Sequence, residues 1–425
     1  MNLYEDNIQQ MSPVWTRIFP IIADRGEGCY IYATDGRKYL DFTCGIGVTN
    51  TGHCHPLVVE AIREQAGLFL HAQANIVIHQ PMLKLIAELK QIVPPSINSF
   101  FFSNSGAEAI EGAVKLARAA TGKTNIIVFS GSFHGRTSGT MALTTSKTIY
   151  RSGFQPLPAG VFVTPYPYSY KLGMTEDQAS DYCLAALEEL LISQTSPAET
   201  AAILIEPILG EGGYVVPPPP FLKGLRKIAD DNGILLILDE IQSGFCRTGK
   251  WFAFEHYGIV PDIMTVAKGI ASGLPLSGVF SSNDIMKKWQ TGSHGGTYGG
   301  NVLACAAGVA TIRAMKSENM PGNAAGRGIQ LMTGLRKLQE QYPLIGDVRG
   351  LGLMIGTELS DLKGKPADKK LTKAIIHACE DHDLLLLSCG TYDNVIRWIP
   401  PLIVTEKQIN DALSVFGDAL KAVTS

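Results

Sequence analysis

Charged residues are scarce in this chain. Asp, Glu, Lys and Arg make up 18% of its 425 residues, against about 25% in an average soluble protein. Apolar residues reach 45%, and a chain of this length is long enough for two or three domains with a large buried core. We expect that the shortage of charge reflects additional surface hidden between subunits.

Long runs of one charge are also missing. The 36 basic and 39 acidic residues leave a formal charge of −3, which argues against a nucleic-acid groove and against a polybasic membrane patch. One long uncharged stretch, residues 152–170, holds four prolines and two glycines and cannot form a spanning helix. The polar N-terminus lacks the pattern of a signal or transit peptide. We therefore expect a cytoplasmic protein with no nucleic-acid or membrane partner.

Paired cysteines are absent as well. The eight cysteines are scattered, and no two have C-x-x-C spacing, so we expect free, buried thiols in a reducing compartment. The triplet His53-Cys54-His55 has neither the HxxxH nor the paired C-x-x-C spacing of a metal site. We therefore expect a turn near a substrate entrance there, and no metal.

The middle of the chain alternates helix-period segments with short β-branched runs, which is typical of a parallel sheet covered by helices. Apolar runs predict strands at 126–129, 202–205, 234–238, 263–266 and 279–281. Helices are predicted at 56–66, 80–89, 107–119, 220–230 and 301–315. Later in the chain the pattern predicts helices at 324–341, 371–381 and 405–422 and a strand at 352–358. We predict an α/β protein with a large, mostly parallel sheet domain (50–315) and a smaller α+β domain (1–49 and 316–425).

Polar residues follow four of the predicted strands. Ligands of an open parallel sheet bind beyond the C-terminal ends of its strands. The residues found there are Phe133-His134-Gly135-Arg136, Glu206 with Glu211 a few residues on, Asp239 and Lys268. A carboxylate and a lysine beside apolar strands are costly to bury unless they form an ion pair or a functional site.

Two clusters of small residues precede predicted helices. Ser103–Ala109 leads into the helix at 107–119 and leaves the first N–H groups of that helix bare, which suits a phosphate, although taken alone the pattern is more typical of an ordinary N-cap. Gly295–Asn301 precedes the helix at 301–315. Residues 117–124 imitate a P-loop, but a helix precedes them and a strand follows, which is the reverse of the order in an NTPase. We therefore predict that Gly122 ends a helix.

The motifs occur in the order found in class III pyridoxal-phosphate aminotransferases of fold type I, which the chain resembles from about residue 41 to residue 401. They are Ser105-Gly106-Ala107-Glu108-Ala109, Phe133-His134-Gly135-Arg136-Thr137, Glu206-Pro207, Gly210–Gly213, Asp239–Phe245, Arg247-Thr248-Gly249, Ala267-Lys268-Gly269 and Gly295–Asn301. Within that class, Cys389–Arg397 together with Ile46 and Glu211 is most similar to 4-aminobutyrate aminotransferases.

The resemblance implies pyridoxal 5'-phosphate as the cofactor. Lys268 would form the Schiff base and then move the substrate proton, and Asp239 would keep the pyridine nitrogen protonated. The other implied cofactor residues are Gln242 at the phenolic oxygen, Glu206 and His134 in support, Phe133 and Ile241 on the ring faces, Ser105, Gly106 and Ala107 at the phosphate, and Thr297 at the phosphate of the other subunit. The implied assembly is a homodimer with a shared active site, or a tetramer.

The resemblance also implies how substrates bind. Arg136 would bind the carboxylate distant from the reacting amine, and Arg397 the α-carboxylate of glutamate or 2-oxoglutarate. Glu211 would neutralise Arg397 when the substrate has no α-carboxylate, and Ile46 would narrow the pocket. The expected reaction is ping-pong transfer of the terminal amino group of an ω-amino acid such as 4-aminobutyrate to 2-oxoglutarate. The partners would be a small amino donor and a 2-oxo acid.

Other functions share parts of this pattern. An acetylornithine- or ornithine-type or an ω-amine:pyruvate aminotransferase is the nearest alternative. Decarboxylases, racemases and aminomutases share Lys268 and Asp239, although the Glu211 and Arg397 pair favours transamination. A non-catalytic scaffold is disfavoured by the intact Lys268 and Asp239. The sequence leaves open the preferred donor and the choice between 2-oxoglutarate and pyruvate.

Overall fold

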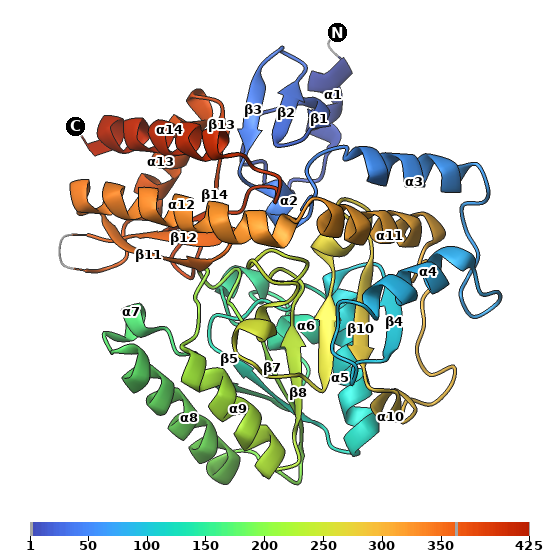
Figure 1. Cartoon of the computed structure of the whole chain (residues 1–425). Helices are drawn as coiled ribbons and strands as arrows, with labels where there is room; N and C mark the ends of the chain where they lie inside the picture. Colours follow the sequence, from blue (N-terminus) through green and yellow to red (C-terminus); the bar gives the residue numbers. More distant parts are fainter. Residues whose placement is uncertain (1–2, 362–363, 425) are drawn as a thin grey trace.

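A seven-stranded sheet forms the centre of the protein. The computed structural model describes residues 3–361 and 364–424, and the sheet has the order β4-β10-β9-β8-β7-β5-β6 (Figure 1). The strands are β4 (Ser99–Ser103), β5 (Asn125–Phe129), β6 (Val161–Thr164), β7 (Thr200–Ile205), β8 (Leu235–Asp239), β9 (Ile263–Val266) and β10 (Ser277–Ser281). Neighbours from β9 to β6 are parallel, and β10 is antiparallel to both β4 and β9.

The five predicted strands of this region are all present, and the predicted mostly parallel α/β sheet is confirmed. The parallel direction implied for residues 279–281 is wrong, because β10 runs antiparallel. Strands β4 and β6 were not predicted. The sequence of β6 is only four residues long and lies between Gly160 and Pro165, where turn signals obscure a short strand.

The sheet separates two apolar cores. Alternate residues of one strand enter different cores, so Ile127 and Phe129 of β5 lie in one cluster, and Ile126 and Val128 in the other. Helix α5 (Gly106–Thr121) covers the second face, while α8 (Glu176–Ser193), α9 (Pro219–Asp231) and α11 (Val302–Ser317) contribute to the first. Strands covered on both faces need unbroken apolar sequences, which is why they were recognisable in the sequence.

The predicted helices of the large region end within two residues of the observed ones. They are α3 (Pro56–Ala66), α4 (Gln80–Leu89), α5, α9 and α11. Gly122 caps α5 in the left-handed conformation, with φ of 70°, as predicted. Helix α8 was not predicted, although Thr175 and Gln178 form a reciprocal capping box at its start. The short helices are α6 (Ser138–Leu143), α7 (Ser169–Leu172) and α10 (Asn283–Met286).

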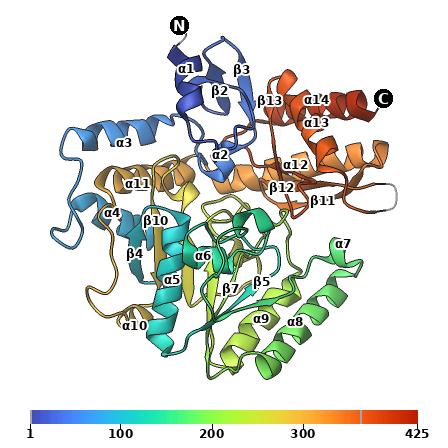
Figure 2. The ribbon, with the colours of Figure 1, turned by 180° about the vertical axis from the view of Figure 1, so that it is seen from behind.

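Two further sheets have four strands each, and one of them joins the N-terminal and C-terminal parts of the chain (Figures 1 and 2). One contains β1 (Ala23–Glu27), β2 (Tyr30–Ala33), β3 (Lys38–Asp41) and β13 (Leu384–Leu385); the other contains β11 (Ile345–Leu351), β12 (Met354–Leu359), β15 (Val395–Trp398) and β14 (Leu387–Cys389). The remaining helices are α1 (Leu3–Gln10), α2 (Cys44–Gly47), α12 (Met320–Gln341), α13 (Lys369–Asp381) and α14 (Glu406–Thr424). The strand predicted at 352–358 is β12, which begins two residues later than predicted, because Gly352 turns the chain with φ of 55°. The domain boundaries stay a prediction.

Seven of the eight cysteines are buried, and all eight are free thiols. The expectation that all would be buried is wrong for Cys54, which is exposed in a turn while its neighbours make contacts: His53 bonds Asp41 and His55 bonds Glu318, each at 2.8 Å. Among the described residues, no three His, Cys, Asp or Glu side chains are placed to hold a metal ion. None of the described helices is long and apolar enough to cross a membrane.

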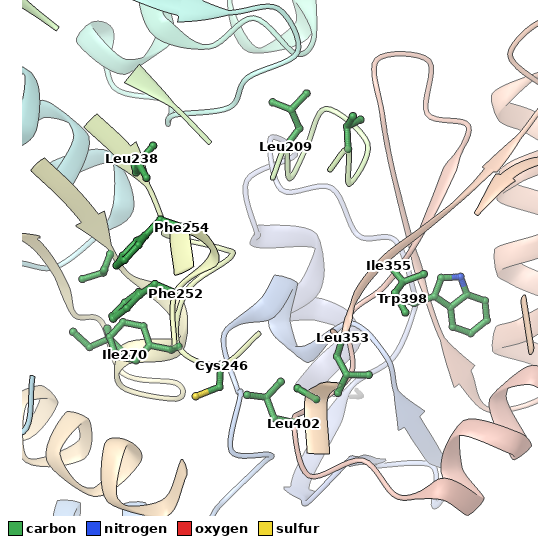
Figure 3. Close-up of a cluster of buried hydrophobic side chains, with 14 of the residues drawn as sticks. Leu209, Leu238, Cys246, Phe252, Phe254, Ile270, Leu353, Ile355, Trp398 and Leu402 are labelled. Carbon is green, nitrogen blue, oxygen red and sulfur yellow. The ribbon is translucent and has the colours of Figure 1, made fainter. Parts of the chain in front are cut away.

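One apolar cluster continues from the large sheet into the C-terminal segments. Figure 3 draws Leu238, Phe252 and Ile270 of the large-sheet region with Leu353, Ile355, Trp398 and Leu402 of the C-terminal region. Arg247 crosses the same junction and is fully buried. Its guanidinium donates to the backbone oxygens of Leu353 (3.2 Å) and Pro400 (2.5 Å) and to Oδ1 of Asn50 (2.7 Å). Arg247 therefore ties together three segments that are distant in sequence.

Replacing Arg247 should destabilise the protein strongly. In Arg247→Ala the three buried acceptors lose their donor, so we expect a loss of at least about 3 kcal/mol. Arg313→Ala is the control, because the Arg313 side chain is 61% exposed and its partner Glu88 keeps a second cation, Lys316, so its loss should cost less than about 1 kcal/mol. Thermal unfolding followed by circular dichroism measures both. Equal midpoints for the two variants would contradict the role given to Arg247.

Candidate active site

A cavity of about 480 Å³ lies at the C-terminal ends of β5, β7, β8 and β9. Twelve of the predicted site residues line it: Ser105, Gly106, Ala107, Phe133, His134, Arg136, Glu206, Glu211, Asp239, Ile241, Gln242 and Lys268. Ile46, Thr297 and Arg397 are not in the lining. The sequence did not single out the lining residues Val48 and Gly273–Leu276, and it gave no role to Asn104, Gly135 and Ala267, which lie within its motifs.

Asp239 is the last residue of β8, and three polar groups contact its carboxylate. Its Oδ2 lies 2.8 Å from Nδ1 of His134, and its Oδ1 accepts the backbone N–H of Ile241 (3.1 Å) and the hydroxyl of Thr265 (3.4 Å). Asp239 and His134 are both buried. The sequence left open a structural ion pair between Asp239 and Lys268. Among the described residues that pair does not form, because Asp239 is paired with His134 instead.

Lys268 follows β9, separated from it by Ala267 alone, and its backbone is in the left-handed region with φ of 50°. Such a conformation is costly for a residue with a side chain and is concentrated at functional sites. Burial is the main reason why the pKa of Lys268 falls to about 8; Glu211 opposes the change, and Arg397 adds to it. A pKa near 8 leaves a usable fraction of the amine neutral at physiological pH, as a nucleophile requires.

The Glu206 carboxylate accepts hydrogen bonds from the backbone of two loops of the site. Its Oε1 accepts the N–H of Phe133 and its Oε2 the N–H of Gly210, both at 2.8 Å. Burial is the largest influence and raises the pKa of Glu206 to about 7, with His134 acting in the opposite direction. The carboxylate thus links the segment after β5 to the loop that carries Glu211.

The start of α5 provides an anion-binding end of the cavity. The Ser105 hydroxyl accepts the N–H of Glu108 (3.3 Å), and the Glu108 carboxylate accepts the N–H of Ser105 (3.0 Å). Gly106 and Ala107 are the first residues of the helix, and the first N–H groups of any helix lack an acceptor within it. The positive end of the helix dipole favours a phosphate at this place.

Glu211 lies between the cavity and Arg397. Nη1 of Arg397 is 2.5 Å from Oε1 of Glu211, and Nη2 donates to the backbone oxygen of Ser388 at 2.9 Å. Burial is the largest influence and acts to raise the pKa of Glu211, but the charge and hydrogen bond of Arg397 together with the charges of Lys268 and Lys147 outweigh it, so the net pKa is lowered and the carboxylate stays ionised. Arg397 is itself buried behind this carboxylate, which explains why it does not line the cavity.

Arg136 is an exposed cation at the cavity, and none of the described carboxylates pairs with it. Its guanidinium carbon lies 4.9 Å from the ring centroid of Tyr150 and 5.9 Å from that of Phe133. The two rings contact each other edge to face at 5.1 Å. Tyr150 was missed by the sequence reasoning, because no local pattern indicates that it stacks on Arg136. Nearby, Lys147 forms an ion pair with Asp393 of the β14–β15 turn.

Two predicted site residues lie on the surface of the single chain. Ile46 is 39% exposed, with φ of 65°, and Thr297 is exposed in the loop before α11. In this chain alone Ile46 does not narrow the cavity, and Thr297 does not reach it.

Known proteins are similar to this protein over nearly the whole chain. The family described as Aminotransferase class-III matches residues 11–420. The 4-aminobutyrate aminotransferase GabT of Escherichia coli is 41% identical over 423 residues, which are 98% of each protein. The 5-aminovalerate aminotransferase DavT of Pseudomonas aeruginosa is 40% identical over 405 residues, 95% of this chain and 94% of that protein. An acetylornithine aminotransferase of Methanocaldococcus jannaschii is 41% identical over 410 residues, with 95% and 94% covered.

Solved structures are similar over the same length. An (S)-enantioselective omega-transaminase from Thermomicrobium roseum has a TM-score of 0.92 and 30% identity, covering 100% of this chain and 98% of that one. An amine transaminase from an uncultivated Pseudomonas species, in its PLP-bound form, has a TM-score of 0.91 and 30% identity, with 97% and 98% covered. The chain therefore belongs to the class III aminotransferases, and it is a pyridoxal-phosphate-dependent transaminase of fold type I.

Proposed function

We propose that this transaminase moves the terminal amino group of an ω-amino acid, such as 4-aminobutyrate, to 2-oxoglutarate in two half-reactions. The observation that carries the proposal is the ion pair between Glu211 and Arg397 at the edge of the cavity. Such a pair lets one site accept substrates with and without an α-carboxylate. The similarity to 4-aminobutyrate and 5-aminovalerate aminotransferases supports the same substrate class.

The residues of the cavity fit pyridoxal phosphate. The cavity volume of about 480 Å³ lies within the range of cofactor sites. In the cavity, Gln242 Oε1 and His134 Nε2 are buried without a partner among the described residues. When bound, the cofactor supplies an aldehyde and an electron-withdrawing ring. We propose that the N–H groups of Gly106 and Ala107 bind its phosphate, Asp239 its ring N–H, and Gln242 its phenolic oxygen. Phe133 and Ile241 would enclose the ring.

Lys268 is proposed to be the catalytic residue that holds the cofactor and moves the substrate proton. Its lowered pKa leaves part of the amine neutral, so Lys268 would hold the cofactor through its aldehyde, with loss of water. Once the substrate amine has taken its place, the freed Lys268 amine would take a proton from the substrate carbon and return it. Asp239 is fixed by His134, so its charge needs no reorganisation during the reaction. Glu206 keeps Phe133 in place through the backbone.

The two arginines are proposed to select the substrate. Arg136 binds the carboxylate distant from the reacting amine; it is exposed to the cavity and positioned by the Tyr150 ring. Glutamate brings a second carboxylate, which displaces Glu211 from Arg397. 4-Aminobutyrate brings none, so Glu211 stays on Arg397 and no unpaired buried charge is left beside the methylene chain.

A second copy of the chain is proposed to complete the site. The loop that contains Thr297 lies beside residues 67–79, since Tyr298 contacts the His71 ring at 5.2 Å and Asn301 donates to the Leu70 oxygen at 3.4 Å. This region exposes a row of apolar side chains: Leu68, Leu70, Ile76, Val77 and Ile78. An exposed apolar patch of this kind is typical of a subunit interface. We propose a homodimer in which Thr297 binds the phosphate in the partner's cavity; a tetramer remains a prediction.

The role of Lys268 is tested by removing its amine. Lys268→Ala should lower turnover by more than about 1,000-fold, because the nucleophile and the proton carrier are lost together. Lys227→Ala is the control, since Lys227 is a surface lysine of α9 paired with Asp231. Glutamate formation from 4-aminobutyrate and 2-oxoglutarate measures both. Turnover of Lys268→Ala within tenfold of the control would refute the assignment.

The two-arginine scheme predicts opposite effects of two substitutions. Arg397→Ala should weaken the glutamate half-reaction by about 100-fold and the 4-aminobutyrate half-reaction far less, because only glutamate has an α-carboxylate. Glu211→Gln should instead weaken the 4-aminobutyrate half-reaction, by about tenfold, because Arg397 is left uncompensated. Single-turnover absorbance changes of the bound cofactor measure each half-reaction. Parallel losses for both substrates would rule the scheme out, and a panel of donors with 2-oxoglutarate or pyruvate would identify an acetylornithine- or pyruvate-type enzyme.

The shared site predicts that activity depends on the dimer. Ile76→Lys places a charge in the apolar row and should give a monomer with less than about a tenth of the wild-type activity. Ile192→Lys, at an equally exposed position on α8, should remain a dimer with normal activity. Light scattering gives the mass and turnover the activity. A fully active monomer is incompatible with a site completed by Thr297 of the partner.

A further inference from the structure

Arg349 contacts the loop that carries Glu211 and is not part of the cavity lining. It belongs to β11, and its side chain is 11% exposed. Nη2 and Nε both donate to the backbone oxygen of Gly213, at 2.6 and 3.1 Å. Arg349 is thus bonded through two nitrogens to the main chain two residues after Glu211.

The guanidinium is held firmly in this position. Nη1 contacts the carboxylates of Asp347 (2.7 Å) and Glu358 (2.8 Å), and Nη2 donates to the Tyr168 hydroxyl at 2.6 Å. The Tyr168 ring also stacks near the guanidinium, with its centroid 4.7 Å from the central carbon. Two carboxylates and an aromatic ring therefore fix the orientation of the donors that reach Gly213.

Gly213 is shaped for this contact. Its φ is +121°, a region that other residues rarely adopt, and a Cβ there would lie 3.2 Å from Nη2 of Arg349. The absence of a side chain lets the guanidinium approach the backbone closely.

The loop is fastened at two further points. Glu206 accepts the N–H of Gly210 at 2.8 Å, and Gly390 donates to the oxygen of Glu211 at 2.9 Å. The backbone on both sides of Glu211 is therefore fixed, and Glu211 is left with freedom only in its side chain. The position of its carboxylate against Arg397 depends on that fixed backbone.

We propose that Arg349 is a positioning residue that sets Glu211 against Arg397 and thereby favours amino donors that lack an α-carboxylate. This inference rests on the proposed function of the Glu211 and Arg397 pair. Glutamate needs Glu211 to leave Arg397, so a loosened loop does not hinder it. 4-Aminobutyrate needs Glu211 to stay, so the same loosening weakens its binding.

Arg349→Lys tests the proposal in the cofactor-loaded enzyme. Lysine keeps a positive charge beside Asp347 and Glu358 but cannot direct two donors at Gly213. We expect the concentration of 4-aminobutyrate that half-saturates its half-reaction to rise about tenfold, with the limiting rate and the glutamate half-reaction changed less than about twofold. Hydrogen exchange of the peptide 209–214 should become faster, while the β11 and β12 amides keep their protection.

Arg226→Lys is the matched control. Arg226 is similarly buried and pairs with two carboxylates, Asp230 and Asp262, on α9 and before β9, at the opposite end of the sheet from the cavity. It should change neither the donor preference nor exchange in 209–214. Tyr168→Phe, which keeps the ring and removes one partner of Arg349, should shift the donor preference in the same direction by a smaller factor, and it decides the matter if Arg349→Lys does not fold.

Equal losses in both half-reactions, or unchanged half-saturation and exchange in the folded variants, would overturn the proposal. A wild-type enzyme that does not react with 4-aminobutyrate would instead overturn the proposed function. In that case the exchange of 209–214 still decides whether Arg349 fixes the loop.

Discussion

The common direction of β5, β7, β8 and β9 is the constraint on which the site depends. Parallel strands end at one edge of the sheet, so the residues that follow them meet although they are far apart in sequence. His134, Glu206, Asp239 and Lys268 reach one cavity for this reason. Helices on both faces keep the strands apolar, so polar chemistry is confined to this edge.

Burial at that edge has a different consequence for each ionisable group. It lowers the pKa of Lys268 to about 8 and raises that of Glu206 to about 7. The pKa of Glu211 is lowered although it is buried, because Arg397, Lys268 and Lys147 together offset the effect of burial. The fold thus places a partly neutral amine, a carboxyl group near its titration point and a charged carboxylate within one cavity, each with its own neighbours.

The cavity and the two arginines that contact the Glu211 loop depend on different sheets. The large sheet supplies the residues proposed to hold the cofactor, whereas Arg397 and Arg349 come from β15 and β11 of a smaller sheet. The proposed substrate selection therefore depends on how the two sheets are joined. Arg247 and the continuous apolar cluster of Figure 3 make that junction rigid, which allows a contact such as Arg349 to Gly213 to be maintained.

The sequence by itself determined the buried strands, the helices with clear periodicity, the Gly122 cap, and the identity of most cavity residues, because these depend on local patterns or on motifs in a fixed order. Only the tertiary structure decided that β10 runs antiparallel, that β13 pairs with β3, that Asp239 pairs with His134, and that Tyr150 stacks on Arg136. It also placed Ile46 and Thr297 on the surface of the single chain. Strand direction and side-chain contacts between distant segments are set by the packing of the whole chain, so they cannot be predicted from a local sequence pattern.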